Sequence, residues 1–149
     1  MELSKFKHKC QVQVRTFDID SQGIVHNSVY LKYLEIGRVE FRKSFGYKIR
    51  PDGTFNDGLR FVVVHNSIDY RSFAVLDDVL NIYTRVSWVK NSSFCFEQII
   101  ENDVTKKIIC EGIGILVNLD KFKNEPSALD KKFLDELLQY DKEVAIIRD

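Results

Sequence analysis

The stretch RTFDIDSQGIVHNSVYLKYLEIGR, from Arg15 to Arg38, determines how the rest of the chain is interpreted. It begins as the end of a strand, passes through a loop with two aspartates and a glycine, and continues as an apolar helix. A helix N-terminus leaves backbone N–H groups without intrahelical partners. Carboxylates at such a helix start predict either a structural cap or a site for acyl transfer.

The periodicity of the chain predicts the elements on both sides of this loop. Alternating apolar residues indicate strands, and apolar residues at spacings of three and four indicate helices. Gly37 inside the long helix is expected to permit close approach to a sheet. The apolar arc of that helix includes Leu31 and Ile36 and predicts a helix largely wrapped by other structure. We expect strands at 9–17, 61–70, 79–90, 94–101 and 107–119, and helices at 28–45 and 127–145.

These elements predict a single α+β domain over residues 1–149. The order is strand, long helix, four strands and short helix, and the short turns favour antiparallel neighbours among the strands from residue 61 onward. Ser127 and Asp130 resemble a capping box for the last helix, directly after Pro126. We therefore expect a curved antiparallel sheet of five or six strands around one long helix.

Composition restricts the classes of function. Lys and Arg total 22, as do Asp and Glu, so no basic field for nucleic acid is present, and the zero net charge mildly favours self-association. No apolar run is long enough to cross a membrane, and no secretory signal is evident, so a cytoplasmic protein is expected. The three cysteines are expected to be buried thiols: Cys10, Cys95 and Cys110.

The spacing of the aspartates argues against a metal site. Asp18-x-Asp20 resembles the start of an EF-hand loop, but Val29 occupies the position that requires a bidentate glutamate. The histidines show no zinc-ligand spacing. We expect no metal and no cofactor.

The motif R-x-F-x-x-D-x-x-G-x-V-x-N-x-x-Y-x-x-Y-x-E-x-x-R resembles the signature of hotdog-fold acyl-CoA thioesterases. More narrowly, it is similar to 4-hydroxybenzoyl-CoA thioesterase and the YbgC-type enzymes. The similarity extends loosely over residues 8–126 and includes the Asp77-Asp78 pair. It departs from the YbgC type at two positions. Those enzymes often have Tyr at the position of His26 and usually have His at the position of Asn27.

The resemblance implies a hotdog fold, pairing of sheet edges into a homodimer or homotetramer, and hydrolysis of acyl-CoA to acid and CoA. It implies that Asp20 is the nucleophile or the general base, and that the Asn27 backbone N–H polarises the thioester carbonyl. Asp18 is expected to shape the turn. Candidate substrate-binding residues are Gly23, Val25, His26 and Tyr30.

Two other functions stay open. A hotdog module can bind acyl-CoA or an acyl-carrier protein without hydrolysing it. A hydratase or dehydratase on the same fold needs a catalytic histidine, and no histidine here lies in a matching motif. The sequence leaves open the acyl group and the residues that bind the CoA phosphates, for which Arg60, Arg71, Lys90, Lys121 and Lys123 are available.

Overall fold

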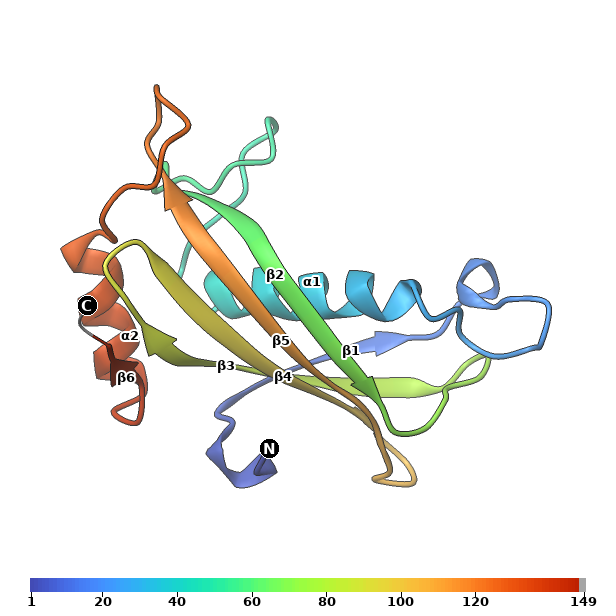
Figure 1. Ribbon diagram of the computed structural model, residues 1–149. Coiled ribbons are helices and arrows are strands. Elements are labelled where there is room, and N and C mark those ends of the chain that lie inside the picture. The colour runs from blue at the N-terminus through green and yellow to red at the C-terminus, as the bar shows by residue number, and fades with distance from the viewer. Residues whose placement is uncertain (148–149) are drawn as a thin grey trace. The chain divides into compact units, whose positions relative to one another are not determined.

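The computed structural model describes residues 1–147 and contains six strands and two α-helices (Figure 1). Two short 3-10 turns, at Leu3–Lys5 and Thr16–Asp18, flank the first strand. The main elements are β1 (His8–Gln13), α1 (Val29–Lys43), β2 (Arg60–Tyr70), β3 (Val79–Val89), β4 (Ser93–Asn102), β5 (Ile108–Leu119), α2 (Lys131–Tyr140) and β6 (Ala145–Ile146).

The strands pair in the order β1-β3-β4-β5-β2, and β6 pairs with β3. β1 runs antiparallel to β3, from His8 opposite Thr84 to Gln13 opposite Val79. β6 is parallel to β3, with Trp88 opposite Ala145. The sequence did not predict β6, because a two-residue strand has too few residues to show alternation.

The expectation that the strand at 61–70 pairs with the strand at 79–90 is wrong. β2 lies next to β5 instead. The N–H groups of Arg71 and Ser72 both donate to Ile109 O, at 2.8 and 3.0 Å, so the chain stays attached to β5 beyond the end of β2. The segment 71–78 is long enough to carry the chain away from β2 before β3 starts, which a tight hairpin turn would not allow.

The chain divides into two compact units, which we describe separately. The first contains Met1–Phe41, Ser67–Arg85 and Gln98–Gly112. The second contains Arg42–Asn66, Val86–Glu97 and the chain from Ile113 onward.

In the first unit, α1 packs closely on β3 and β4. A Cβ atom added to Gly37 would lie 2.6 Å from Ile82 Cγ2 and 2.7 Å from Gln98 Nε2. The Gln98 amide also donates to Leu34 O at 2.8 Å. The prediction that Gly37 permits close approach to the sheet is confirmed, since no larger residue fits there without displacing its neighbours.

The prediction of a helix wrapped on most sides is wrong for the single chain. Tyr30, Tyr33 and Leu34 are buried, but Leu31 and Ile36 are each 40% exposed. The buried positions recur at the helical spacing and form one stripe that faces the sheet, whereas Leu31 and Ile36 lie outside that stripe.

In the second unit, α2 is shorter than the predicted helix at 127–145. Asp130, not Ser127, caps it, because the Asp130 carboxylate accepts the Lys132 N–H at 3.1 Å. Ser127 N–H donates to Asn118 O at 2.9 Å, and this bond holds the preceding segment extended. After Tyr140 the chain leaves the helix and forms β6.

A buried arginine organises the core of the second unit. The Arg42 side chain is ion-paired with Asp57. Its guanidinium carbon lies 4.7 to 5.4 Å from the centroids of four aromatic rings, those of Tyr47, Phe55, Phe61 and Phe133. The charge is therefore neutralised by one carboxylate and surrounded by ring faces.

Candidate active site

A tight turn in the first unit fixes the position of Asp20. Ile19 and Val25 form an isolated antiparallel bridge, and inside it Asp20 N–H donates to Ile24 O at 2.9 Å. Gly23 N–H donates to Asp20 O at 3.1 Å and has φ +78°. A positive φ at this position favours glycine over any residue with a side chain.

The Asp20 carboxylate is half-buried and only partly satisfied. Oδ1 accepts the Gln22 N–H at 2.8 Å. Within residues 1–147, no group donates to its second oxygen. This oxygen is available to a proton, a water or a carbonyl carbon.

Asp18 is buried and does not line the pocket. Its Oδ2 accepts the Arg15 N–H at 3.0 Å and the Tyr33 hydroxyl at 2.8 Å. Its own carbonyl accepts the His26 N–H at 3.0 Å. Burial and the bond to Asp18 raise the pKa of Tyr33 well above its usual range. Asp18 therefore ties together both ends of the loop and the helix, in agreement with its expected role in shaping the turn.

The start of α1 leaves the Asn27 N–H free. Val29 N–H donates to His26 O at 2.9 Å, and the N–H and C=O of a trans peptide point in opposite directions. The N–H on the other side of that peptide, that of Asn27, therefore points away from the helix. It makes no hydrogen bond to any described residue. Ser28 N–H, in contrast, is occupied by His26 Nδ1 at 3.1 Å.

Tyr70 fixes the next peptide of the helix start. Its hydroxyl donates to Asn27 O at 3.0 Å. The sequence did not point to Tyr70 as a site residue, because it lies at the end of β2 and reaches residue 27 only after the sheet has formed.

A pocket of about 530 Å³ opens beside these groups. Of the residues predicted for the site, it brings together Asp20, Val25, His26, Asn27 and Tyr30, while Gly23 is absent from its lining. The segment after β2, which the sequence did not single out apart from Arg71 as one available cation, supplies a second wall. The described residues that line the pocket are Asp20, Gln22, Ile24, Val25, His26, Asn27, Tyr30, Tyr70, Arg71, Ser72 and Phe73.

Tyr30 belongs both to the pocket and to the hydrophobic core. It is buried, and its hydroxyl accepts the Ala74 N–H at 3.1 Å. Its ring contacts Tyr33 and Tyr70 edge-on, with centroids 6.0 and 5.7 Å away. Burial raises the pKa of Tyr30. The phenol therefore stays neutral and anchors the segment after β2 to the helix.

One cation faces this pocket. Arg71 is ion-paired with Glu111 at 3.3 Å, yet just over half of its side-chain surface is exposed. A guanidinium that carries several donors can keep this pair and still bind an anionic substrate group.

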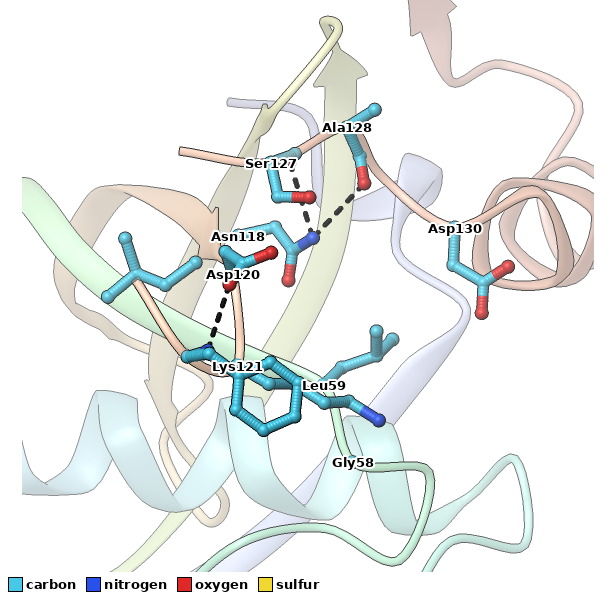
Figure 2. Close-up of a pocket in the computed structure, with 10 residues that line it drawn as sticks. Gly58, Leu59, Asn118, Asp120, Lys121, Ser127, Ala128 and Asp130 are labelled. Carbon is cyan, nitrogen blue, oxygen red and sulfur yellow. Dashed lines mark hydrogen bonds between the residues drawn. The ribbon is translucent and has the colours of Figure 1, made fainter. Parts of the chain in front are cut away.

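A smaller pocket of about 270 Å³ lies in the second unit between the start of β2 and the end of β5 (Figure 2). Asn118 Nδ2 donates to the carbonyls of Ser127 and Ala128, at 3.3 and 3.1 Å. Lys121, another of the available cations, lines this pocket. The Asp120 carboxylate is committed to its own turn, because it accepts the Phe122 and Lys123 N–H groups. Both N–H groups bind Oδ1, so the second oxygen of Asp120 has no donor among the described residues. None of the residues of the Arg15–Arg38 motif lines this pocket.

The Thioesterase-like superfamily matches residues 14–137 of the chain. The chain belongs to this superfamily. The hotdog fold and the resemblance to thioesterases that the Arg15–Arg38 motif predicted are thereby confirmed.

Several thioesterases are similar to the chain over most of their own length. The chloroplastic acyl-acyl carrier protein thioesterase ATL3 of Arabidopsis thaliana is 30% identical over 142 residues, which cover 93% of this chain and 73% of that protein. The acyl-CoA thioesterase YbgC of Haemophilus influenzae is 32% identical over 109 residues, covering 69% and 79%. A Thermus thermophilus thioesterase, solved with coenzyme A and Zn, is 26% identical, with a TM-score of 0.79 over 94% of this chain and 98% of that one.

Two features are absent from the described residues, a membrane-spanning helix and a cluster of metal ligands. Within residues 1–147, no helix is both long and apolar enough to cross a membrane. Over the same residues, no group of three or more His, Cys, Asp or Glu side chains is placed to hold a metal ion.

Proposed function

We propose that this protein hydrolyses acyl-CoA thioesters to a free acid and CoA. The observation that carries the proposal is that Asp20, which has a free carboxylate oxygen, and Asn27, which has a free N–H, line one pocket. Thioester hydrolysis needs a group that attacks or activates water and a donor that stabilises the oxyanion. The membership in the Thioesterase-like superfamily supports the same reaction.

Asp20 can act by two routes. As a nucleophile, its carboxylate attacks the thioester carbonyl, CoA thiolate leaves, and water hydrolyses the resulting mixed anhydride to regenerate the carboxylate. As a general base, it takes a proton from a water that attacks the carbonyl directly. Both routes need the oxygen of Asp20 that no described residue occupies, and neither consumes a cofactor.

Asn27 acts through its backbone. As the carbonyl carbon becomes tetrahedral, its oxygen gains negative charge, which the Asn27 N–H and the positive end of α1 stabilise. Tyr70 holds the neighbouring peptide in place at 3.0 Å. The donor is thus oriented before substrate arrives, which is the condition for this type of stabilisation.

The proposed substrate carries its acyl group on CoA. Similarity to ATL3, named as acting on acyl-acyl carrier protein, makes a carrier-protein thioester the alternative substrate. A module that binds such thioesters without hydrolysis is the alternative function. The test therefore includes both carriers and a binding measurement.

The decisive experiment compares wild type with Asp20→Asn on acyl-CoA of short, long and aromatic chains and on acyl-carrier protein, with detection of the free thiol. We expect at least about a 10³-fold loss of kcat in the variant, because removal of one essential group in a catalytic unit typically costs this much or more. Asp135→Asn is the matched control, since Asp135 is exposed on α2 and its one ion pair among residues 1–147 is with Lys131 at 2.9 Å.

Two outcomes would contradict the proposal. Thiol release by Asp20→Asn at the wild-type rate would remove Asp20 from the chemistry. Tight binding of acyl-CoA with no thiol release by wild type would assign the chain to the non-hydrolytic class.

We also propose that the protein is a homodimer or homotetramer. β2 lies at one end of the strand order, and Val62, Val63 and Val64 on it are 37%, 43% and 58% exposed. An exposed apolar edge strand favours pairing with a second copy. Size-exclusion chromatography with light scattering should give at least twice the 17.4 kDa chain mass. A single-chain mass at micromolar concentration would contradict this.

A further inference from the structure

We infer that His26, held in one tautomer by Ser28, supplies a second hydrogen bond to the substrate carbonyl oxygen beside the Asn27 N–H. This inference rests on the proposed thioester hydrolysis. The proposed oxyanion site otherwise contains a single backbone donor, and the hydrogen bonds around residues 26–29 indicate where a second donor comes from.

The backbone cannot supply that second donor from the next two residues. Ser28 N–H donates to His26 Nδ1 at 3.1 Å, and Val29 N–H donates to His26 O at 2.9 Å. Among the N–H groups of residues 27–29, only that of Asn27 is left without a described partner.

These contacts determine the tautomer of His26. A backbone N–H can only donate, so Nδ1 must accept and the proton of the neutral ring must be on Nε2. The Ser28 hydroxyl, 2.7 Å from Nδ1, then donates to the same atom. With Nδ1 occupied, one polar group of the imidazole has no partner among residues 1–147 and is free to bind a ligand, the Nε2–H.

The position of the ring makes this donor available to substrate. His26 is exposed and lines the pocket next to Asn27 and together with Asp20. Its backbone is fixed on both sides, by His26 N–H to Asp18 O at 3.0 Å and by the bond from Val29. The ring therefore projects from a rigid segment, and a preformed neutral donor of this kind suits a developing oxyanion.

Other polar groups of the pocket are less suited to this role. The Tyr70 hydroxyl donates to Asn27 O, and the Arg71 guanidinium is paired with Glu111. Asp20, as a carboxylate, can only accept. His26 is left as the neutral donor adjacent in the chain to the proposed oxyanion donor.

Two amide substitutions separate the donor role from a purely structural one. In His26→Asn, the side-chain oxygen can take the place of Nδ1 and accept from Ser28, but no donor remains at the Nε2 position. In His26→Gln, the amide nitrogen can take the place of Nε2, but the acceptor for Ser28 is lost. We expect kcat of His26→Asn to fall by about 10²-fold with KM nearly unchanged, as for loss of one oxyanion donor. His26→Gln should keep more of kcat and lose stability instead.

The opposite ranking would overturn the inference. If His26→Asn keeps the wild-type kcat while His26→Gln loses it, the ring acts only as a cap for Ser28. Both variants are compared with wild type on a substrate that wild type hydrolyses and Asp20→Asn does not. An unchanged kcat in the His26 variants is then distinguishable from a failure of the proposed hydrolysis.

A spectroscopic measurement tests the tautomer without any assay of activity. In a two-bond ¹H–¹⁵N correlation spectrum of the labelled protein at pH 8, the His26 ring should show a proton on Nε2 and a bare Nδ1. Ser28→Ala should weaken this preference, since it removes the 2.7 Å hydroxyl contact. A proton on Nδ1 in wild type would overturn the inference even if the protein proves to be an active thioesterase.

Discussion

The loop from Arg15 to Ser28 has a packed side and a pocket side, and each carries one aspartate. On the packed side, Asp18 is 8% exposed and accepts two donors on one oxygen. On the pocket side, Asp20 is half-buried, accepts one backbone N–H and keeps an oxygen free. The same chemical group thus serves the fold in one position and is available for chemistry two residues later.

A short loop can therefore be rigid on one side and reactive on the other. The Arg15 N–H and the hydroxyl of the buried Tyr33 are satisfied on the packed side. The groups on the pocket side, Asp20 and the Asn27 N–H, are left unsatisfied at a surface that water or substrate can reach. Rigidity from one side maintains the geometry of the other.

The largest test of this comparison is Asp18→Ala. We expect the free energy of unfolding to fall by about 2–4 kcal/mol, because two donors lose their acceptor at about 1–3 kcal/mol each. Asp20→Ala should change it by less than about 0.5 kcal/mol, as for other partly exposed residues away from the core. Urea denaturation followed by circular dichroism measures both, and equal losses would show that the two sides of the loop do not differ.

Tyr33→Phe provides a graded control on the packed side. It removes only the hydroxyl that donates to Asp18 at 2.8 Å and leaves the ring in place. The expected loss is about 1 kcal/mol, smaller than for Asp18→Ala, since the Arg15 N–H keeps its acceptor. A loss as large as that of Asp18→Ala would show that the tyrosine hydroxyl, and not the carboxylate as a whole, accounts for the free energy of unfolding lost in Asp18→Ala.

A loss of stability at alkaline pH is expected from two thiols of the core that also contains Val14, Val25 and Tyr33. Burial and the nearby charge of Glu40 raise the pKa of Cys10 to about 11, and burial raises that of Cys110 to about 12. A raised pKa means that the folded state holds its proton more tightly than the unfolded chain does. The resulting stability is complete below the unfolded value of about 8.5 and is lost as pH rises through the folded value.

We therefore expect the free energy of unfolding to stay level up to about pH 8 and to decline between about pH 9 and 11. Cys10→Ala should make that decline shallower. Urea titrations at each pH provide the measurement. An identical decline in wild type and variant would mean that Cys10 does not carry this dependence.

Local patterns predicted most of the elements closely. The strand predicted at 79–90 is observed at Val79–Val89, and the one at 107–119 at Ile108–Leu119. Both show strong alternation, which reports directly on one buried face. The helix predicted at 127–145 failed at both ends, because the bond between Ser127 and Asn118 and the pairing of β6 with β3 join residues distant in sequence.

The residues of the candidate site also fall into two groups, those that the sequence predicted and those that strand pairing brings to the pocket. The motif identified Asp20 and Asn27, and His26 was a candidate as the neighbour of Asn27, since the turn residues and the helix start lie together in the sequence. It gave no sign of Tyr70, Ser72 or Phe73, which line the same pocket as Asn27. Their position follows from β2 lying next to β5 and not next to β3. Pairing partners of strands are not encoded in the strands' own periodicity.

The elements, the resemblance to thioesterases and the two aspartates of the loop follow from the sequence alone. The burial of Asp18 and the residues distant in sequence that contact the loop follow only from the fold. The physical reason is that composition and periodicity report on local geometry and burial. The satisfaction of a particular donor or acceptor, in contrast, depends on groups that folding brings from elsewhere, such as Tyr33 to Asp18 and Tyr70 to Asn27.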